Sequence, residues 1–183
     1  MNAPVHLEHP VAACRHTQSI TVGVGELVVT DDPNTVLLIP ALGSCIAVCL
    51  WDPRARVAGL LHFLLPDSAQ HADRASAQPG AFADTGIPLL FETAYKWGLQ
   101  KGRAVVRLAG GAEITAPGST APQSIGKRNV LIARRLLWAN GVFIDKEVTG
   151  GLSPRSVYLS ATNGRLDVRT GTDHVILPCE VSQ

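Results

Sequence analysis

Three consecutive apolar segments constrain the fold of this chain more than any other feature. They read TVLLIPALG, SCIAVCLWD and VAGLLHFLLP; Gly43 divides the first two, and the turn sequence DPRAR divides the last two. Near-continuous apolar runs of this length, bounded by turn residues, are typical of strands that are covered on both faces. The segments therefore predict neighbouring buried strands in a layered domain.

Further strand signals follow along the chain. Apolar and β-branched residues predict strands within 19–30, 104–114, 142–151, 155–171 and 174–178. The fourth of these stretches contains Asn163-Gly164, a dipeptide that strongly favours a two-residue hairpin turn. The residues on either side of this dipeptide are therefore predicted to form two antiparallel strands.

Two helices are predicted between the strands. The first has Asp84 or Thr85 as its N-cap and ends at Gly102. The second runs from about Ile125 to Asn140, where an Asn-Gly pair stops it. With about eight strands and two main helices, the pattern predicts an α+β domain.

The domain organisation is simple. Residues 1–18 have no periodicity and are predicted to form a flexible tail, and residues 19–183 are predicted to form a single domain. Inside this domain the small and polar residues of 67–83 predict a long loop.

The composition excludes several classes of protein. Hydrophobic residues make up 46% of the chain and charged residues 17%, which is a globular balance. The formal net charge of +1 provides no broad field for nucleic acid or for an anionic membrane. The N-terminus lacks the pattern of a secretory signal, and no apolar run approaches the roughly 20 residues that span a bilayer. We therefore expect a cytoplasmic protein without nucleic-acid partners or membrane insertion.

The four cysteines are predicted to be free thiols, because a chain of 183 residues does not need disulfides to fold. Cys45 and Cys49 have C-x3-C spacing, and His174 and Cys179 lie near the other end. A zinc site normally needs a second closely spaced ligand pair, which the sequence lacks. We therefore predict no metal, and Cys49 is expected to be a core residue.

Cys45 and His62 allow two interpretations. Both are residue types that are common in protein cores, so they fit neighbouring buried strands. Alternatively, the turn between the strands brings them together as a nucleophile and its base. Gly43 and Ser44 precede the cysteine, so the backbone can approach a substrate and offer N–H groups to an oxyanion.

Three more residues lie near these segments or in the second predicted helix. Gly110 and Gly111 follow a predicted strand, and they provide either a close approach to substrate beside Cys45 or a tight turn without chemistry. Asn129 is predicted to form local hydrogen bonds at a helix start or in a loop.

Five segments together resemble one family. The stretches ALGSCIAVCLWDP, AGLLHFLLPD, FADTGIPLL, LAGGAEI and SIGKRNV occur in the order and approximate spacing of the chemoreceptor glutamine deamidases, the CheD family. The closing stretch VTGGLSPRSVYLSATNGRLDVRTG is also similar to the family's final hairpin. The resemblance covers about residues 20 to 175.

The resemblance implies a fold, a site and a reaction. The expected fold is a layered α/β sandwich of mixed sheets, related to bacterial toxin deamidases. Cys45 is implied to be the nucleophile and His62 its general base, converting glutamines on the cytoplasmic helices of chemoreceptors to glutamate through a thioester. Some members also hydrolyse methyl-glutamate esters, and some bind a CheC-type phosphatase. No cofactor or metal is implied.

One departure from the family pattern leaves a second hypothesis open. Members of the family carry a threonine five or six residues before the cysteine, where this chain has Pro40 and Ile39. Neither side chain accepts a hydrogen bond, so a backbone carbonyl would have to orient the imidazole. The alternative is a non-catalytic module that docks on receptor helices or on a phosphatase partner.

Overall fold

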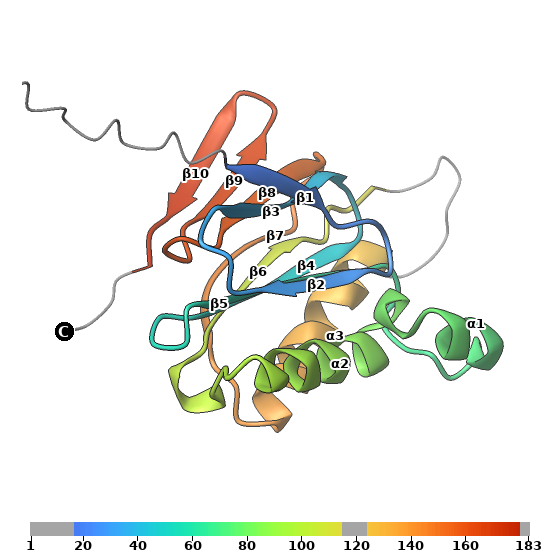
Figure 1. The fold of residues 1–183 in the computed structure, drawn as a ribbon. Coiled ribbons are helices and arrows are strands. Elements are labelled where there is room, and N and C mark those ends of the chain that lie inside the picture. Colours follow the sequence, from blue (N-terminus) through green and yellow to red (C-terminus); the bar gives the residue numbers. More distant parts are fainter. Residues whose placement is uncertain (1–16, 115–123, 180–183) are drawn as a thin grey trace, which may run out of the picture.

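The protein is a three-layer arrangement of two sheets and a layer of helices (Figure 1). The computed structural model describes residues 17–114 and 124–179. The two sheets are stacked, and the two long helices cover the second sheet on the side away from the first (Figure 1). The predicted α+β class and the layered sandwich are confirmed. Most of the predicted tail, residues 1–18, lies outside the described residues.

Each sheet has five strands and mixes parallel with antiparallel pairs. The strands of the first sheet, in spatial order, are β1 (Gln18–Thr21), β3 (Thr35–Leu42), β8 (Arg155–Ser160), β9 (Leu166–Thr170) and β10 (Asp173–Leu177). Those of the second are β2 (Leu27–Thr30), β5 (Val57–Phe63), β4 (Ile46–Asp52), β6 (Val105–Gly110) and β7 (Ile144–Thr149). The predicted hairpin joins β8 to β9, but residues 161–165 separate the two strands, so the connection is longer than a two-residue turn; Gly164 within it has a φ of 69°.

The helices are α1 (Ala72–Ala77), α2 (Ala83–Lys96) and α3 (Ile125–Ala139), and two short 3₁₀ turns span Pro79–Ala81 and Lys101–Arg103. The second predicted helix therefore has nearly the predicted limits. Val130, Ala133 and Leu137 form its buried stripe, as their spacing predicts. Within the described ranges, no helix is both long and apolar enough to cross a membrane.

Strands β4 and β5 form the centre of the molecule, as their apolar sequences predict. All seven residues of each strand are buried. On one face of β4, Ile46, Val48 and Leu50 pack against the helices, and on the other face Ala47 and Cys49 pack against the first sheet. Full burial of an aliphatic side chain contributes about 1.5–3 kcal/mol, so the two faces of this strand pair hold the three layers together.

Two local predictions were wrong. Residues 19–30, predicted as one strand, form β1 and β2, which belong to different sheets. The chain crosses between the sheets in the intervening loop, where Gly25 has a φ of 78°. The predicted loop 67–83 contains α1 and a 3₁₀ turn, because small residues such as alanine also suit short helices.

The limits of α2 also differ from the prediction. The helix starts after Phe82 without a side-chain cap, and Asp84 accepts hydrogen bonds from the amide and hydroxyl of Ser68 instead. It ends at Lys96, followed by Gly98 with a φ of 90°, and not at Gly102. A tertiary contact and an earlier glycine therefore override the local signals.

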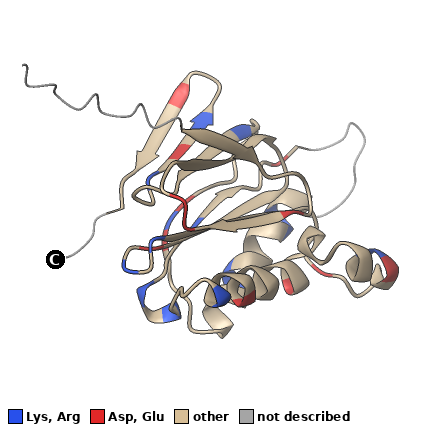
Figure 2. Ribbon diagram, viewed as in Figure 1, with Lys and Arg blue, Asp and Glu red and all other residues tan. Residues whose placement is uncertain are grey.

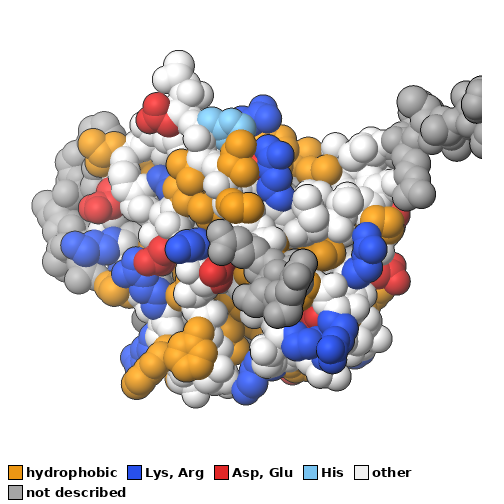
Figure 3. All heavy atoms as spheres, turned by 90° about the vertical axis from the view of Figure 1, so that its left-hand side faces the viewer, with side chains coloured by type: hydrophobic (Ala, Val, Ile, Leu, Met, Phe, Trp, Pro, Cys, Tyr) orange, Lys and Arg blue, Asp and Glu red, His pale blue; other side chains and the backbone are white. Residues whose placement is uncertain are grey.

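Charges are distributed without a dominant sign over the surface. Lys and Arg alternate with Asp and Glu over the helices and loops (Figure 2). On the face seen in Figure 3, which is the left-hand side of Figure 1, charged and hydrophobic side chains are mixed. This distribution agrees with the net charge of +1.

Candidate active site

Cys45 and His62 lie at the same end of the central strand pair. Strands β4 and β5 are antiparallel, and His62 is directly opposite Ala47. Cys45 lies two residues before Ala47, just before β4 begins, and it packs against the same core cluster as Ala47, so it is on the same face of the sheet as His62. The turn between the strands therefore places the two predicted residues at the same end and on the same face of the sheet.

The imidazole of His62 is oriented by a backbone carbonyl. Its Nδ1 lies 3.2 Å from the carbonyl oxygen of Val22. A carbonyl only accepts hydrogen bonds, so Nδ1 carries the proton and Nε2 of the neutral ring is the acceptor. Val22 itself is 1% exposed and its amide donates to the carbonyl of Leu38 in β3 at 2.8 Å. The orienting group is thus fixed by the first sheet.

The loop between β1 and β2 also holds the backbone of His62. The amide of His62 donates to the carbonyl of Glu26 at 3.0 Å, and the amide of Gly25 donates to the carbonyl of His62 at 2.7 Å. Residues 22–26 therefore contact both the ring and the main chain of the histidine. The division of 19–30 into two strands, which the sequence did not predict, is what creates this loop.

Burial keeps both side chains of the pair neutral near pH 7. It raises the pKa of the Cys45 thiol, and the cysteine's own amide offsets this only in part. Burial also lowers the pKa of His62, against smaller opposite effects of the Val22 carbonyl and of the Glu26 charge. A neutral imidazole beside a neutral thiol is the resting state of a general-base mechanism.

Gly110 and Gly111 bring the end of β6 against the backbone of Cys45. Their φ angles are 111° and 65°, in the left-handed region. The amide of Gly111 donates to the carbonyl of Cys45 at 2.8 Å, and a Cβ on Gly110 would lie 2.3 Å from the same oxygen. This close approach needs glycine, and it uses the N–H of Gly111 for the main chain of Cys45.

Two other predicted residues lie at the start of β4. The carbonyl of Gly43 accepts from the amide of Ala112 at 3.0 Å, which ties the bend before the cysteine to β6. The amides of Ser44 and Cys45 have no hydrogen-bond acceptor among residues 17–114 and 124–179, apart from the contact of the Cys45 amide with its own sulfur. These two N–H groups are available to an oxyanion next to the sulfur.

Asn129 connects α3 to both strands of the pair. It is fully buried, and its Nδ2 donates to the carbonyls of Ser44 at 3.0 Å and Leu64 at 2.8 Å. These bonds are long-range, so the prediction of a local role was wrong. The available sequence signal was a polar residue on the buried stripe of an amphipathic helix.

The structure also shows the state of the other cysteines and the grouping of residues that could bind a metal. Cys49 is buried in the core as predicted, and burial raises its pKa to about 12. The cysteines of the described ranges, Cys45, Cys49 and Cys179, are free thiols. Cys14 lies outside these ranges. No group of three or more His, Cys, Asp or Glu side chains that suits a metal occurs in the described part.

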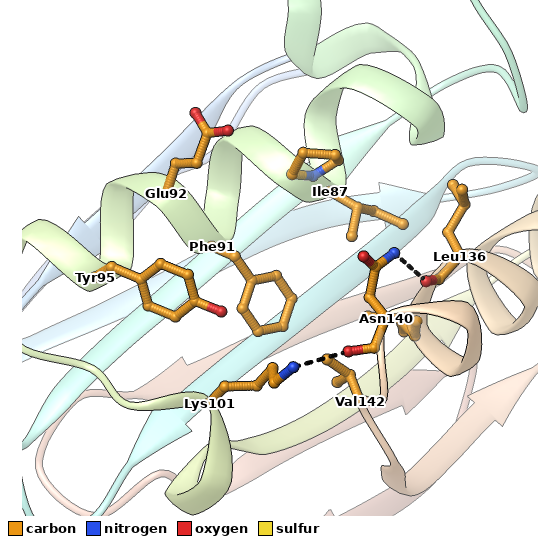
Figure 4. A pocket seen from close by; sticks show the side chains of 10 residues that line it. Ile87, Phe91, Glu92, Tyr95, Lys101, Leu136, Asn140 and Val142 are labelled. Carbon is orange, nitrogen blue, oxygen red and sulfur yellow. Dashed lines mark hydrogen bonds between the residues drawn. The ribbon is translucent and has the colours of Figure 1, made fainter.

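A separate hollow lies between α2 and α3 (Figure 4). It has a volume of about 210 Å³ and is lined mainly by apolar side chains, among them Ile87, Phe91 and Val142. The ammonium group of Lys101 donates to the carbonyl of Asn140 at its rim, at 3.0 Å. Its lining includes neither Cys45 nor His62, so the hollow is not part of the candidate site.

Comparisons with known proteins identify the family. A family model described as "CheD chemotactic sensory transduction" matches residues 64–170. A relative from Syntrophus aciditrophicus, named probable chemoreceptor glutamine deamidase CheD 1, is 42% identical over 151 residues, 82% of this chain and 93% of its own. Another from Anaeromyxobacter dehalogenans, probable chemoreceptor glutamine deamidase CheD 2, is 45% identical over 83% of this chain and 94% of its own.

The similarity to a solved structure is weaker. The hypothetical protein YfiH of Bacillus licheniformis is 14% identical with a TM-score of 0.43, over 75% of this chain and 61% of its own. This likeness is too low to support an argument about function. The family model and the relatives, by contrast, extend over most of the described chain, and they show that the protein belongs to the CheD family.

Proposed function

We propose that this protein deamidates glutamine side chains of chemoreceptors, with Cys45 as the nucleophile and His62 as the general base. The names of its relatives support the substrate and the reaction. The observation that supports the assignment of residues is the hydrogen bond between His62 Nδ1 and the Val22 carbonyl, because it leaves Nε2 as the acceptor of the ring on the face of the sheet where Cys45 lies.

The first half-reaction forms a thioester. His62 Nε2 takes the thiol proton as Cys45 Sγ attacks the side-chain amide carbon of the glutamine. The amide oxygen becomes an oxyanion, which the N–H groups of Ser44 and Cys45 stabilise. The imidazolium then gives its proton to the amide nitrogen, the C–N bond breaks, and ammonia leaves.

The second half-reaction releases glutamate. Nε2 takes a proton from a water molecule, and the resulting hydroxide attacks the thioester carbon. The C–S bond breaks and the thiolate recovers the proton from the imidazolium. One water is consumed and one ammonia released for each glutamine, so the pair returns to its neutral resting state. Methyl esters of glutamate undergo the same two steps with methanol as the leaving group, and this esterase activity belongs to the proposal.

The alternative, a non-catalytic docking module, rested on the missing threonine. The carbonyl of Val22 supplies the hydrogen bond that the threonine position lacks, so this departure no longer favours an inactive protein.

A CheC-type phosphatase partner and a cytoplasmic location stay predictions. Copurification from the native cell tests the first, and fractionation tests the second.

Mass spectrometry of a chemoreceptor cytoplasmic fragment tests the proposal. Incubation with wild-type protein should raise the mass of target glutamine peptides by about one dalton per site, as amide becomes acid. Cys45→Ala should bind the fragment without converting it, whereas Cys179→Ala, at a second partly buried thiol, should convert it normally. Conversion by Cys45→Ala at the wild-type rate, or no conversion by the wild type on the organism's own receptors, would refute the proposal.

A further inference from the structure

We propose that Asn129 is a positioning residue that fixes the peptide group between Ser44 and Cys45, so that the N–H of Cys45 points at the developing oxyanion. This inference rests on the proposed deamidase function and deepens it. Asn129 lies in α3, 84 positions from Cys45 in the chain. Through its hydrogen bond to Ser44 it controls the direction of the Cys45 N–H, the donor that the reaction needs.

The first observation is where the amide of Asn129 binds. The paired residues of β4 and β5 end at Ile46 and Phe63. Immediately beyond this last pair, Asn129 Nδ2 donates to the carbonyls of Ser44 at 3.0 Å and of Leu64 at 2.8 Å. One side chain therefore holds together the strand ends that carry Cys45 and His62, at the point where their own ladder stops.

The geometry of the peptide group sets the direction of the Cys45 N–H. The carbonyl of Ser44 and the N–H of Cys45 belong to one planar, trans peptide group, so they point in opposite directions. Asn129 holds this carbonyl toward α3, and the N–H is therefore directed away from α3. Cys45 and His62 lie on the face of the sheet opposite the helices. The N–H is thus turned to the side of the sheet on which Cys45 and His62 lie.

The third observation is that Asn129 is not fully satisfied. Its Oδ1 is buried without a hydrogen-bond partner in the described part of the chain. A buried acceptor without a partner costs stability, which an apolar side chain at this position would avoid. The two N–H donors of the side-chain amide are therefore the feature of Asn129 that the site uses. The hydrogen bond to the Ser44 carbonyl also polarises the Ser44–Cys45 peptide and so strengthens the Cys45 N–H as a donor.

Two reactions of the same sulfur separate this role from a general structural one. Deamidation develops an oxyanion, whereas alkylation of Cys45 by iodoacetamide displaces iodide at a saturated carbon and develops none. Loss of an oxyanion donor lowers kcat by about 100- to 1000-fold in other enzymes. Asn129→Leu, which removes both donors at similar size, should therefore lower kcat about 100-fold, with KM and the alkylation rate within about threefold of wild type.

The controls make the test decisive. Asn140→Ser changes the other asparagine of the α3 region, whose exposed side chain donates to the carbonyl of Leu136 at the helix end, and it should leave kcat unchanged. If Asn129→Leu does not fold, as judged by its thermal unfolding, Asn129→Ser replaces it; a single shorter donor should then lower kcat with unchanged alkylation.

Three outcomes are distinguishable. A lowered kcat with unchanged alkylation supports the positioning role. An unchanged kcat, or a parallel fall of kcat and alkylation rate, overturns it, because the residue would then be dispensable or would only hold the strands together. If the wild type fails to deamidate receptor fragments, the proposed function fails first, and this outcome is visible before any Asn129 variant is compared.

Discussion

The Nδ1 of His62 is hydrogen-bonded to the carbonyl oxygen of Val22 at 3.2 Å. This contact joins the two sheets, since His62 is in β5 and Val22 follows β1, whose partner is β3. It fixes the tautomer of the ring as a side-chain hydroxyl or carboxylate does in other Cys-His and Ser-His sites. Because the orienting group is a carbonyl, no substitution at position 22 removes it directly. The imidazole itself is therefore the residue to test.

Replacement of His62 should abolish turnover without abolishing binding. In His62→Asn the thiol keeps its raised pKa and loses its proton acceptor, so kcat should fall by at least about 100-fold. Ammonia release measures kcat, and fragment binding measures affinity. His174→Asn, at an exposed histidine in β10, is the matched control and should keep wild-type kcat. Retention of more than about a tenth of wild-type kcat by His62→Asn would argue against the general-base role.

The pH dependence of kcat/KM should show a broad plateau. The active form has neutral His62 and neutral Cys45. Burial lowers the pKa of His62 from its ordinary 6.5, so the acid limb should lie below pH 6.5. Burial raises the pKa of Cys45 from its ordinary 9.0, so the alkaline limb should lie above pH 9. A pH–rate profile with receptor fragment measures both limbs. An acid limb above 6.5 would contradict the assignment.

The lowered pKa of His62 also predicts how the free energy of unfolding depends on pH. The folded state binds fewer protons than the unfolded state between the lowered pKa and 6.5. The contribution of His62 is therefore fully present above pH 6.5 and is lost as the pH falls toward the folded-state pKa. Urea unfolding at several pH values measures it. His62→Asn should flatten this part of the curve, and an unchanged slope would show that other groups are responsible.

Gly110→Ala should lower the free energy of unfolding and kcat more than the same substitution at a glycine with open space around it. The added Cβ would lie 2.3 Å from the carbonyl oxygen of Cys45, at a φ of 111°. Strain in this region costs about 1–3 kcal/mol, and displacement of the Cys45 backbone should also lower kcat. Gly171→Ala is the control, because its φ is 57° and nothing lies within 4 Å of the added atom. Equal losses of unfolding free energy and unchanged kcat in both variants would refute this expectation.

Asp52 at the far end of β4 should matter for stability and not for catalysis. Its carboxylate is fully buried and accepts hydrogen bonds from Arg103 and from the amides of Arg54, Ala55 and Gln100. Burial tends to raise its pKa, but these hydrogen bonds outweigh burial and lower it. Asp52→Ala leaves Arg103 and the amides without their partner and should cost about 3 kcal/mol of unfolding free energy.

The matched control for Asp52 is a more exposed ion pair. Asp167→Ala breaks a pair with Arg165 that is partly solvated, and it should cost less than about 1 kcal/mol. Urea unfolding compares the two variants. Kinetics of the folded Asp52→Ala protein should give wild-type kcat, and a selective loss of kcat with little loss of stability would show that this end of β4 communicates with Cys45.

The sequence by itself determined the central strand pair and the neighbourhood of Cys45 and His62. The apolar runs fixed β4 and β5 as buried strands, and the DPRAR turn fixed their antiparallel pairing, which places His62 opposite Ala47. The limits of α3 followed from its periodicity and its Asn-Gly stop. These features are local: hydrophobic spacing and turn residues act over a few positions and are visible in the residues themselves.

Only the tertiary structure decided which groups complete the site. The carbonyl of Val22 orients His62, and the carbonyls of Ser44 and Leu64 receive Asn129. Every residue has a carbonyl, so no side-chain pattern marks the ones that matter. Likewise, residues 19–30 have a single strand-like pattern, but the chain uses them in two sheets, because both sheets offer an edge for pairing at that point. Such partners become known only when distant segments are brought together.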